Sequence, residues 1–199
     1  MSKIILASES LRRQDLLRQI SIPFEVVVSG FDEESFIAEQ AVFLSPSKLA
    51  GALAAQKAHA VSAKQESSAF ILAADTVVVF EDKIFGKPKD TADAAGMLYA
   101  LRKNTHTVIT GGALLYRQNI VQFSAEANVT LRDMTDNEIR DYVASGEPFG
   151  KAGGYAIQEK GAVFVTHIQG DYYAVVGLPL APLYAAFLRL GYQIMENWK

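Results

Sequence analysis

The residues of this sequence most able to do chemistry are polar side chains placed where apolar segments end or are interrupted. Ser8, Arg12 and Arg13 follow a short apolar run at residues 4–6. Backbone N–H groups and hydroxyls at the start of a helix can hold an anion, and forked guanidinium groups suit phosphate oxygens. By itself this is weak evidence, because an arginine pair at this place is more often the solvated first turn of a surface helix. This stretch alone therefore leaves both interpretations open.

Asp75 carries the strongest individual signal. It interrupts the apolar stretch FILAADTVVVF at residues 70–80. A carboxylate that loses its water in such surroundings costs free energy unless a cation, a hydrogen bond or a reaction uses it. We therefore predict a functional role for Asp75.

A further set of charged residues completes a pattern typical of phosphate chemistry. It consists of a loop of three acidic residues at 32–34 and of Lys57 and Lys87, each of which alone is more typical of a protein surface. Together with the arginines and Asp75, they supply cations for phosphates, carboxylates for Mg²⁺ or Mn²⁺ and a base for water. The sequence therefore predicts a site for a polyphosphate and a divalent metal ion.

Composition excludes several other classes of protein. The 19 Lys and Arg residues against 22 Asp and Glu lack the basic excess of proteins that follow a nucleic-acid backbone, so no nucleic-acid partner is expected. The absence of cysteine excludes disulfides, thiolate metal sites and a cysteine nucleophile. No apolar run approaches the length of a membrane helix, so we expect no membrane partner and a cytoplasmic location. The 199 residues predict one domain, residues 1–199.

The elements that must position these residues alternate as in a layered α/β domain. Strands are predicted at about 3–7, 24–28, 70–80, 106–117, 120–131, 162–168 and 172–176, and helices at about 10–20, 47–64, 91–102, 136–144 and 180–190. The helix at 136–144 starts with a capping box from Thr135 to Glu138. A glycine-rich, irregular segment, SGEPFGKAGGYAIQ, follows it.

An ordered series of motifs resembles the Maf family of nucleoside triphosphate pyrophosphatases. The motifs are LASESLRR, SGFDEE, LAAQKA, AADTVV, GKPKD, SGEPFGKAGGYAIQ and YYAVVGLPL, and they run from about residue 4 to about residue 190. The resemblance implies a single two-lobed α/β domain with a mixed, twisted sheet flanked by helices, related to inosine triphosphate pyrophosphatases. The implied substrate is a nucleoside triphosphate, and two-lobed enzymes of this type often dimerise, so a homodimer is compatible with the resemblance.

The resemblance also implies roles for individual residues. Substrate contacts are implied for Ser8, Arg12, Arg13, Lys57, Thr76, Lys87 and Gln158, a catalytic role for Asp75, and metal binding for Glu33 and Asp75. Arg12, Thr76 and Gln158 fall at positions that the family uses for substrate selection. In the implied reaction, Asp75 activates water for in-line attack on the α-phosphorus, and pyrophosphate leaves.

The stretch KAGGYAIQ resembles the subgroup that acts on dTTP and UTP as a house-cleaning activity. Two alternatives stay open on the sequence. One is the sister subgroup that acts on 7-methyl-GTP. The other is a nucleotide-binding regulator of cell division or septation with little catalysis.

Overall fold

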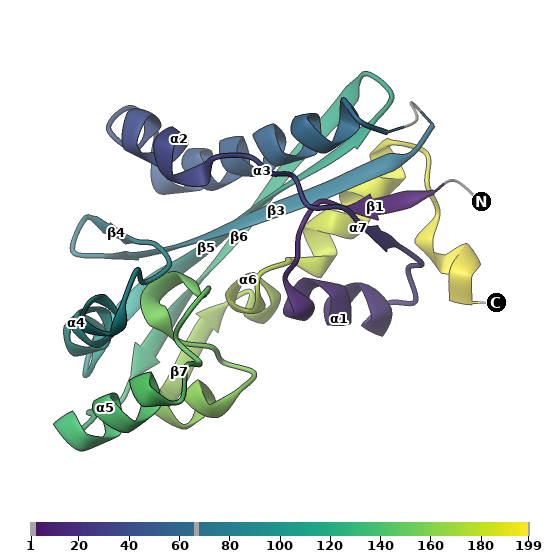
Figure 1. Cartoon of the computed structure of the whole chain (residues 1–199). Helices are drawn as coiled ribbons and strands as arrows, with labels where there is room; N and C mark the ends of the chain where they lie inside the picture. The colour runs from purple at the N-terminus through teal and green to yellow at the C-terminus, as the bar shows by residue number, and fades with distance from the viewer. Residues whose placement is uncertain (1–2, 66–67, 199) are drawn as a thin grey trace. The chain divides into compact units, whose positions relative to one another are not determined.

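The structure, a computed structural model, describes residues 3–65 and 68–198 and shows a mixed α/β fold (Figure 1). Its seven-stranded sheet has the order β2-β1-β3-β5-β6-β7, with β4 paired to β3. β1 runs parallel to β2 and β3, whereas β4 is antiparallel to β3 and β7 is antiparallel to β6. The predicted mixed sheet flanked by helices is therefore confirmed.

The strands are β1 (Ile4–Leu6), β2 (Glu25–Val26), β3 (Phe70–Phe80), β4 (Lys83–Phe85), β5 (Thr105–Tyr116), β6 (Asn119–Leu131) and β7 (Val165–Gly170). The α-helices are α1 (Leu11–Gln19), α2 (Glu33–Gln40), α3 (Pro46–Ser62), α4 (Thr91–Leu101), α5 (Asp136–Ala144), α6 (Tyr172–Val176) and α7 (Leu180–Arg189). Short 3-10 helices are η1 (Ala152–Gly154), η2 (Lys160–Phe164) and η3 (Ile194–Trp198).

The chain divides into two compact units. The first consists of Met1–Asp75, Thr110–Ala125 and Gly177–Lys199, and the second of Thr76–Ile109 and Glu126–Val176. Strand β3 passes from one unit to the other between Asp75 and Thr76. The single domain over residues 1–199 stays a prediction.

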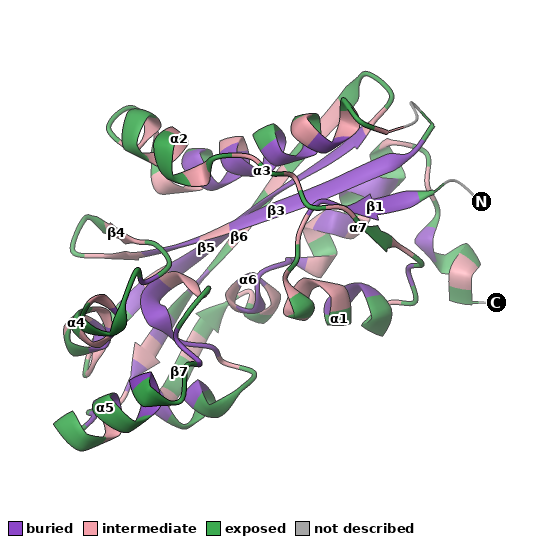
Figure 2. Cartoon of the chain, viewed as in Figure 1, coloured by how far each residue is buried: buried purple, intermediate pink, exposed green. Residues whose placement is uncertain are grey.

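In the first unit, the alternation of side chains along β3 decides what each face of the strand meets. Ile71 and Ala73 pack in one core cluster with Ala54 and Ala58 of α3. The ring of Phe70, which points to the opposite face, lies 5.9 Å from that of Phe187 in α7. β3 is buried along most of its length (Figure 2). Continuing the alternation from Ile71 and Ala73, residue 75 shares the face covered by α3.

A glycine lets α3 come close to the sheet. A Cβ atom added to Gly111 of β5 would lie 2.4 Å from the backbone nitrogen of Gly51 in α3. Real Cβ atoms do not approach a backbone so closely, so any other residue here would push α3 away from the strand. The position of α3 therefore depends on this glycine.

In the second unit, α4 and α5 contribute to one apolar cluster. It contains Leu98 and Leu101 of α4, Ile139 of α5, and Tyr155 from the glycine-rich segment. The predicted capping box at the start of α5 is confirmed, since Thr135 and Glu138 exchange the expected hydrogen bonds. The glycine-rich segment therefore packs with this core although it is irregular.

Three predicted elements differ from the structure. The prediction of an acidic loop at 32–34 is wrong in part, because α2 begins at Glu33. Asp32 caps this helix by accepting a hydrogen bond from the Ser35 backbone at 3.1 Å. The predicted strand 172–176 is the short helix α6, whose Ala174 N–H donates to the Asp171 carboxylate at 3.1 Å. The predicted strand 162–168 begins as 3-10 helix η2 and becomes extended only from Val165.

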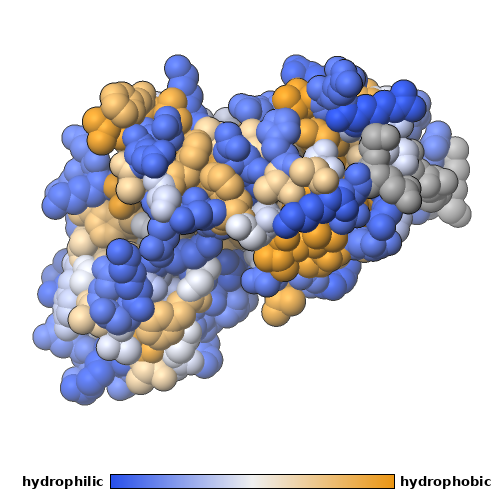
Figure 3. Space-filling model, turned by 45° about the horizontal axis from the view of Figure 1, so that its top comes forward, coloured by the Kyte–Doolittle hydropathy of each residue, from blue (hydrophilic) through white to orange (hydrophobic). Residues whose placement is uncertain are grey.

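Apolar residues on the face shown in Figure 3 form several patches among mostly hydrophilic ones. The largest exposed fractions among big apolar side chains belong to Val42 and Phe43, at 84% and 80%, in the turn after α2. Within residues 3–65 and 68–198, no helix has both the length and the apolar character needed to span a membrane.

Candidate active site

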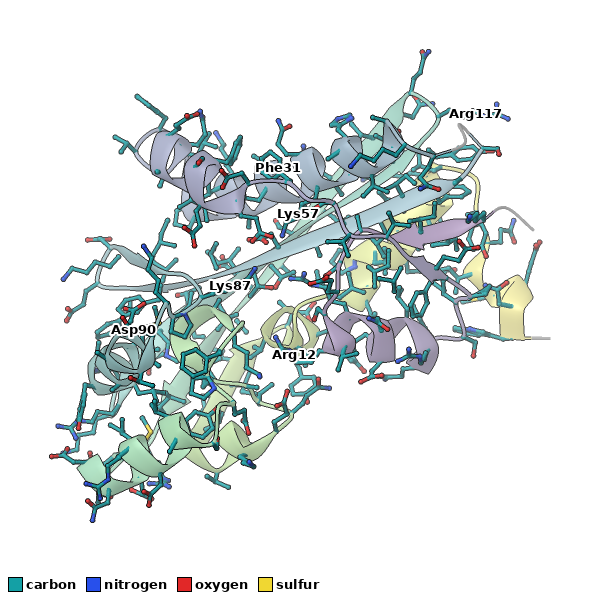
Figure 4. All side chains as sticks on the ribbon, in the orientation of Figure 1. Arg12, Phe31, Lys57, Lys87, Asp90 and Arg117 are labelled. Carbon is teal, nitrogen blue, oxygen red and sulfur yellow. The ribbon has the colours of Figure 1, made fainter. Side chains whose placement is uncertain are left out.

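In the first unit, the carboxylate of Asp75 in β3 is paired with a lysine from α3. Lys57 and Asp75 are only 5% and 6% exposed, and the Lys57 ammonium donates to Asp75 Oδ1 at 2.5 Å. Lys57 extends from α3 toward β3 (Figure 4), on the helix face that also carries Ala54 and Val61, three residues before it and four after it. Each charge would be costly to bury alone, and the pair offsets that cost. This pairing explains how a carboxylate can interrupt the apolar run of β3.

Glu33 joins the same lysine. Its Oε1 lies 2.8 Å from Lys57 Nζ, and its side chain is 27% exposed. Glu33 occupies the first turn of α2, which the Asp32 cap fixes; hydrogen bonds from Ser35 lower the pKa of that capping carboxyl. We call Glu33, Lys57 and Asp75 the Lys57 cluster. With both carboxylates ionised and the lysine protonated, its formal charge is −1.

Glu33 and Asp75 are the two residues of this cluster whose side chains are of the type that could hold a divalent metal ion. Glu33 and Asp75 each place an oxygen within 2.8 Å of the same Lys57 nitrogen. Mg²⁺ commonly takes one or two carboxylates and completes its shell with water and substrate phosphates. Among the described residues, no group of three or more Asp, Glu or His side chains could hold a metal ion. The chemistry of the two carboxylates is thus compatible with an ion that takes its other ligands from water and a phosphate.

Arg13 is built into the start of α1. Its Nε donates to the Gly177 carbonyl at 2.8 Å and its Nη1 to Ser8 Oγ at 3.0 Å. The backbone N–H of Arg13 donates to Ser10 Oγ, which caps the helix. Burial lowers the pKa of the Arg13 guanidinium, while the negative charge of Asp75 partly opposes that shift. The electrostatic coupling to Asp75 links this arginine to the Lys57 cluster.

Arg12 differs from its neighbour. It is half-buried. Successive residues of an α-helix point about 100° apart, so its side chain leaves α1 in a different direction from that of Arg13. The positive charge of Arg12 also lowers the pKa of Arg13, by less than burial does. The first unit thus brings together Ser8, the two arginines and the Lys57 cluster.

The remaining predicted site residues belong to the second unit. Thr76 follows Asp75 in β3 and therefore points to the opposite face of the sheet. Lys87 is exposed between β4 and α4 (Figure 4), and Gln158 is exposed between η1 and η2. The Gly153 N–H donates to the Gly86 carbonyl at 3.1 Å, so the loop that carries Lys87 is tied to the glycine-rich segment.

The sequence did not single out several buried polar residues of the second unit. Glu147, 8% exposed, accepts hydrogen bonds from Tyr142 and from two backbone N–H groups. His106, 2% exposed, shares a 2.7 Å hydrogen bond with the Tyr155 hydroxyl, and burial lowers the pKa of its imidazole to about 4. His106 is therefore neutral at pH 7. The one feature of the sequence that pointed to Glu147 and Tyr155 is that both lie in the motif SGEPFGKAGGYAIQ.

Comparisons with known proteins agree with the resemblance seen in the motifs. Residues 3–190 match the model of a family described as Maf-like protein. The chain is 49% identical over 183 residues to proteins named dTTP/UTP pyrophosphatase from Bacillus cytotoxicus and from Bacillus cereus (strain ATCC 14579), covering 92% of this chain and 93% of each relative.

A more distant likeness exists among solved structures. The Ham1 protein of Staphylococcus aureus aligns with 66% of this chain and 72% of its own, at 15% identity and a TM-score of 0.45. A likeness of this degree carries no information on function.

Proposed function

Because the chain belongs to the Maf-like protein family, we propose that it is a pyrophosphatase that hydrolyses dTTP and UTP to the monophosphate and pyrophosphate. The observation that carries this proposal is the 49% identity, over 92% of the chain, to proteins named dTTP/UTP pyrophosphatase. The Lys57 cluster supports it, since it combines two carboxylates with a cation, the residue types that metal-assisted phosphate chemistry uses.

In the proposed reaction, Asp75 accepts a proton from the water that attacks the α-phosphorus. The Asp75 carboxylate is held by Lys57 and fixed in the rigid strand β3, so its direction is set before substrate binds. A divalent ion held by Glu33 and Asp75 would supply charge neutralisation at the phosphate oxygens. Arg12, Arg13 and Lys87 contribute further positive charge for the triphosphate and its leaving group.

The proposed role of Lys57 combines two tasks. Its ammonium reduces the charge of the two carboxylates from −2 to −1, which weakens their repulsion of a polyanionic substrate. It also holds both carboxylates in place through two ion pairs. A direct contact between Lys57 and a phosphate remains part of the proposal.

Base selection is proposed for Gln158. A side-chain amide has both a donor and an acceptor and can form a two-bond pair with the edge of uracil or thymine. Gln158 is exposed in the second unit and therefore accessible to a ligand. Arg12 and Thr76 are proposed to assist in substrate selection.

The test is pyrophosphate release by the purified protein with Mg²⁺ or Mn²⁺ over all common NTPs and dNTPs. We expect the highest kcat/KM for dTTP and UTP, with the monophosphate and pyrophosphate as products. Release of inorganic phosphate and a diphosphate would refute the proposed bond cleavage. Preference for 7-methyl-GTP would assign the sister subgroup, and nucleotide binding without turnover would favour a regulator. A homodimer and a cytoplasmic location remain predictions, the first testable by light scattering.

A further inference from the structure

A buried carboxylate in the second unit has no part in the proposed reaction, yet it is bonded on both oxygens. Glu147 lies just after α5. Its Oε1 accepts from the Tyr142 hydroxyl at 2.9 Å and from the Gly161 backbone N–H at 2.8 Å. Its Oε2 accepts from the Lys160 backbone N–H at 3.0 Å. Three donors thus satisfy one charge that would otherwise be costly to bury.

The same pair of side chains also holds the other end of the segment that follows. The Tyr142 hydroxyl accepts from the Ala156 backbone N–H at 3.3 Å. Burial and the hydrogen bond to Glu147 both raise the pKa of Tyr142, so the hydroxyl keeps the proton that it donates. Residues 156–161, which we call the Gln158 loop, are therefore tied at their first residue and at their last two.

Close packing shows that this loop is closed on itself. A Cβ atom added to Gly161 would lie 2.6 Å from the Tyr142 hydroxyl oxygen and 2.7 Å from the Ala156 carbonyl oxygen. The two ends of the loop thus meet at Tyr142, with no room for a larger residue. Gln158 stands between the two tied ends and is exposed, whereas Ala156 and Gly161 are buried.

A lysine adds a third tie beside Gln158. Lys151 Nζ donates to the Glu147 carbonyl at 2.6 Å and lies 3.5 Å from Glu159 Oε2. The lysine side chain is 12% exposed. Glu159 is the residue next to Gln158, so this contact restrains the loop close to the proposed base-reading side chain.

We propose that Glu147 and Tyr142 are positioning residues that fix the Gln158 loop and thereby set the selectivity for the base. This inference rests on the proposed role of Gln158. This segment of six residues enters a helical turn only at Lys160. Unless it is held in place, it would lose conformational freedom on binding, and that loss weakens the discrimination that hydrogen bonds provide. The two side chains order the loop in advance, so an amide at position 158 meets each base in one fixed direction.

The variants Glu147→Gln and Tyr142→Phe test the inference. In Glu147→Gln, the amide group replaces one acceptor oxygen by a donor, so either Lys160 or the pair at Oε1 loses its acceptor. In Tyr142→Phe, the Ala156 N–H loses its acceptor, while the ring can keep its edge-on contact with Phe164 at 5.1 Å. We expect the ratio of kcat/KM for dTTP over dCTP to fall about tenfold in either variant, mainly through KM for dTTP.

Two controls separate positioning from general stability. Glu138→Gln removes a carboxylate of the same unit that accepts from Arg132 at 2.7 Å and from the Thr135 N–H at 2.8 Å. It should lower Tm and leave the dTTP over dCTP ratio unchanged. The double variant Glu147→Gln with Gln158→Ala should show the same ratio as Gln158→Ala alone, since Glu147 acts through Gln158.

The outcomes distinguish this inference from the proposed function. If Gln158→Ala keeps the wild-type ratio, Gln158 does not read the base, and both the proposed role and the inference are refuted. If Gln158→Ala lowers the ratio but folded Tyr142→Phe and Glu147→Gln keep it, only the positioning role is overturned. Should Glu147→Gln not fold, Tyr142→Phe alone decides, because it leaves the carboxylate and its two backbone donors in place.

Discussion

Replacing Asp75 by Asn removes one charge from the Lys57 cluster while keeping the shape of the side chain. The amide oxygen can still accept from Lys57, and Lys57 keeps its second carboxylate, Glu33, at 2.8 Å. The formal charge of the cluster rises from −1 to 0. The fold should therefore persist, with a loss in the free energy of unfolding below about 3 kcal/mol.

The effect on turnover should be much larger than the effect on stability. An amide cannot accept a proton at neutral pH, so Asp75→Asn lacks the proposed general base. Loss of general-base catalysis lowers a rate by roughly 10²- to 10⁴-fold. If the carboxylate also binds the metal ion, the loss is greater still. Affinity for dTTP should persist or rise, because a negative charge near the triphosphate is gone.

The assay combines pyrophosphate release with equilibrium binding of dTTP on the same protein, whose folding is checked by circular dichroism. Asp133→Asn is a matched control, since it makes the same chemical change in an exposed pair, with Lys103 Nζ at 2.9 Å. We expect the control to keep wild-type turnover. Turnover of Asp75→Asn within about tenfold of wild type would contradict the reasoning, because it is smaller than the expected loss of a base. Glu33 would then be the next candidate.

Three other perturbations follow from the same structure. Lys57→Met leaves two carboxylates without their shared cation and should lower the free energy of unfolding, measured in urea, by roughly 3–5 kcal/mol. The control Lys103→Met, which breaks an exposed pair, should lower it far less. Arg13→Lys should weaken dTTP capture and lower Tm, because one ammonium cannot replace a guanidinium bonded to two partners, and Arg12→Ala should weaken capture without the same loss of Tm. Burial lowers the His106 pKa from 6.5 to about 4, so the unfolded chain binds a proton at this residue more readily than the folded one. The contribution of neutral His106 to the free energy of unfolding is therefore complete above pH 6.5 and falls by about 3 kcal/mol as the pH drops to 4. The free energy of unfolding of His106→Leu should lack this pH dependence.

Local signals in the sequence predicted some elements to the residue. The helix expected at about 136–144 is α5, Asp136–Ala144, because a capping box fixes its start through residues only three apart. The strand at 70–80 was also exact, since a long apolar run bounded by polar residues has few other interpretations. By contrast, Tyr172–Val176 has the composition of a strand, but a hydrogen bond to Asp171 starts a short helix there.

The sequence predicts which charged residues form the candidate site, but not which of them pair with one another. Asp75 could be found because a charge in an apolar strand is costly whatever its partner. That Lys57 is this partner depends on how closely α3 approaches the sheet, which Gly111 decides from a distant part of the sequence. The role of Glu147 was hidden for a related reason, because its partners include backbone N–H groups 13 and 14 residues further along the chain. Because backbone N–H groups do not depend on residue type, the sequence does not reveal which of them act as donors.

The division of the chain between Asp75 and Thr76 leads to a division of the proposed tasks. The first unit contains the Lys57 cluster and Arg13, whose charges would act on the phosphates, where every nucleoside triphosphate is alike. The second unit contains the Gln158 loop, which would meet the base, where nucleotides differ. Changes in the Lys57 cluster should therefore alter turnover by a similar factor for every nucleotide. Changes at Tyr142 or Glu147 should alter the ranking of nucleotides and leave the best turnover nearly intact. A substrate panel measured on one variant from each unit compares the two effects directly, and a parallel shift for both variants would contradict this division.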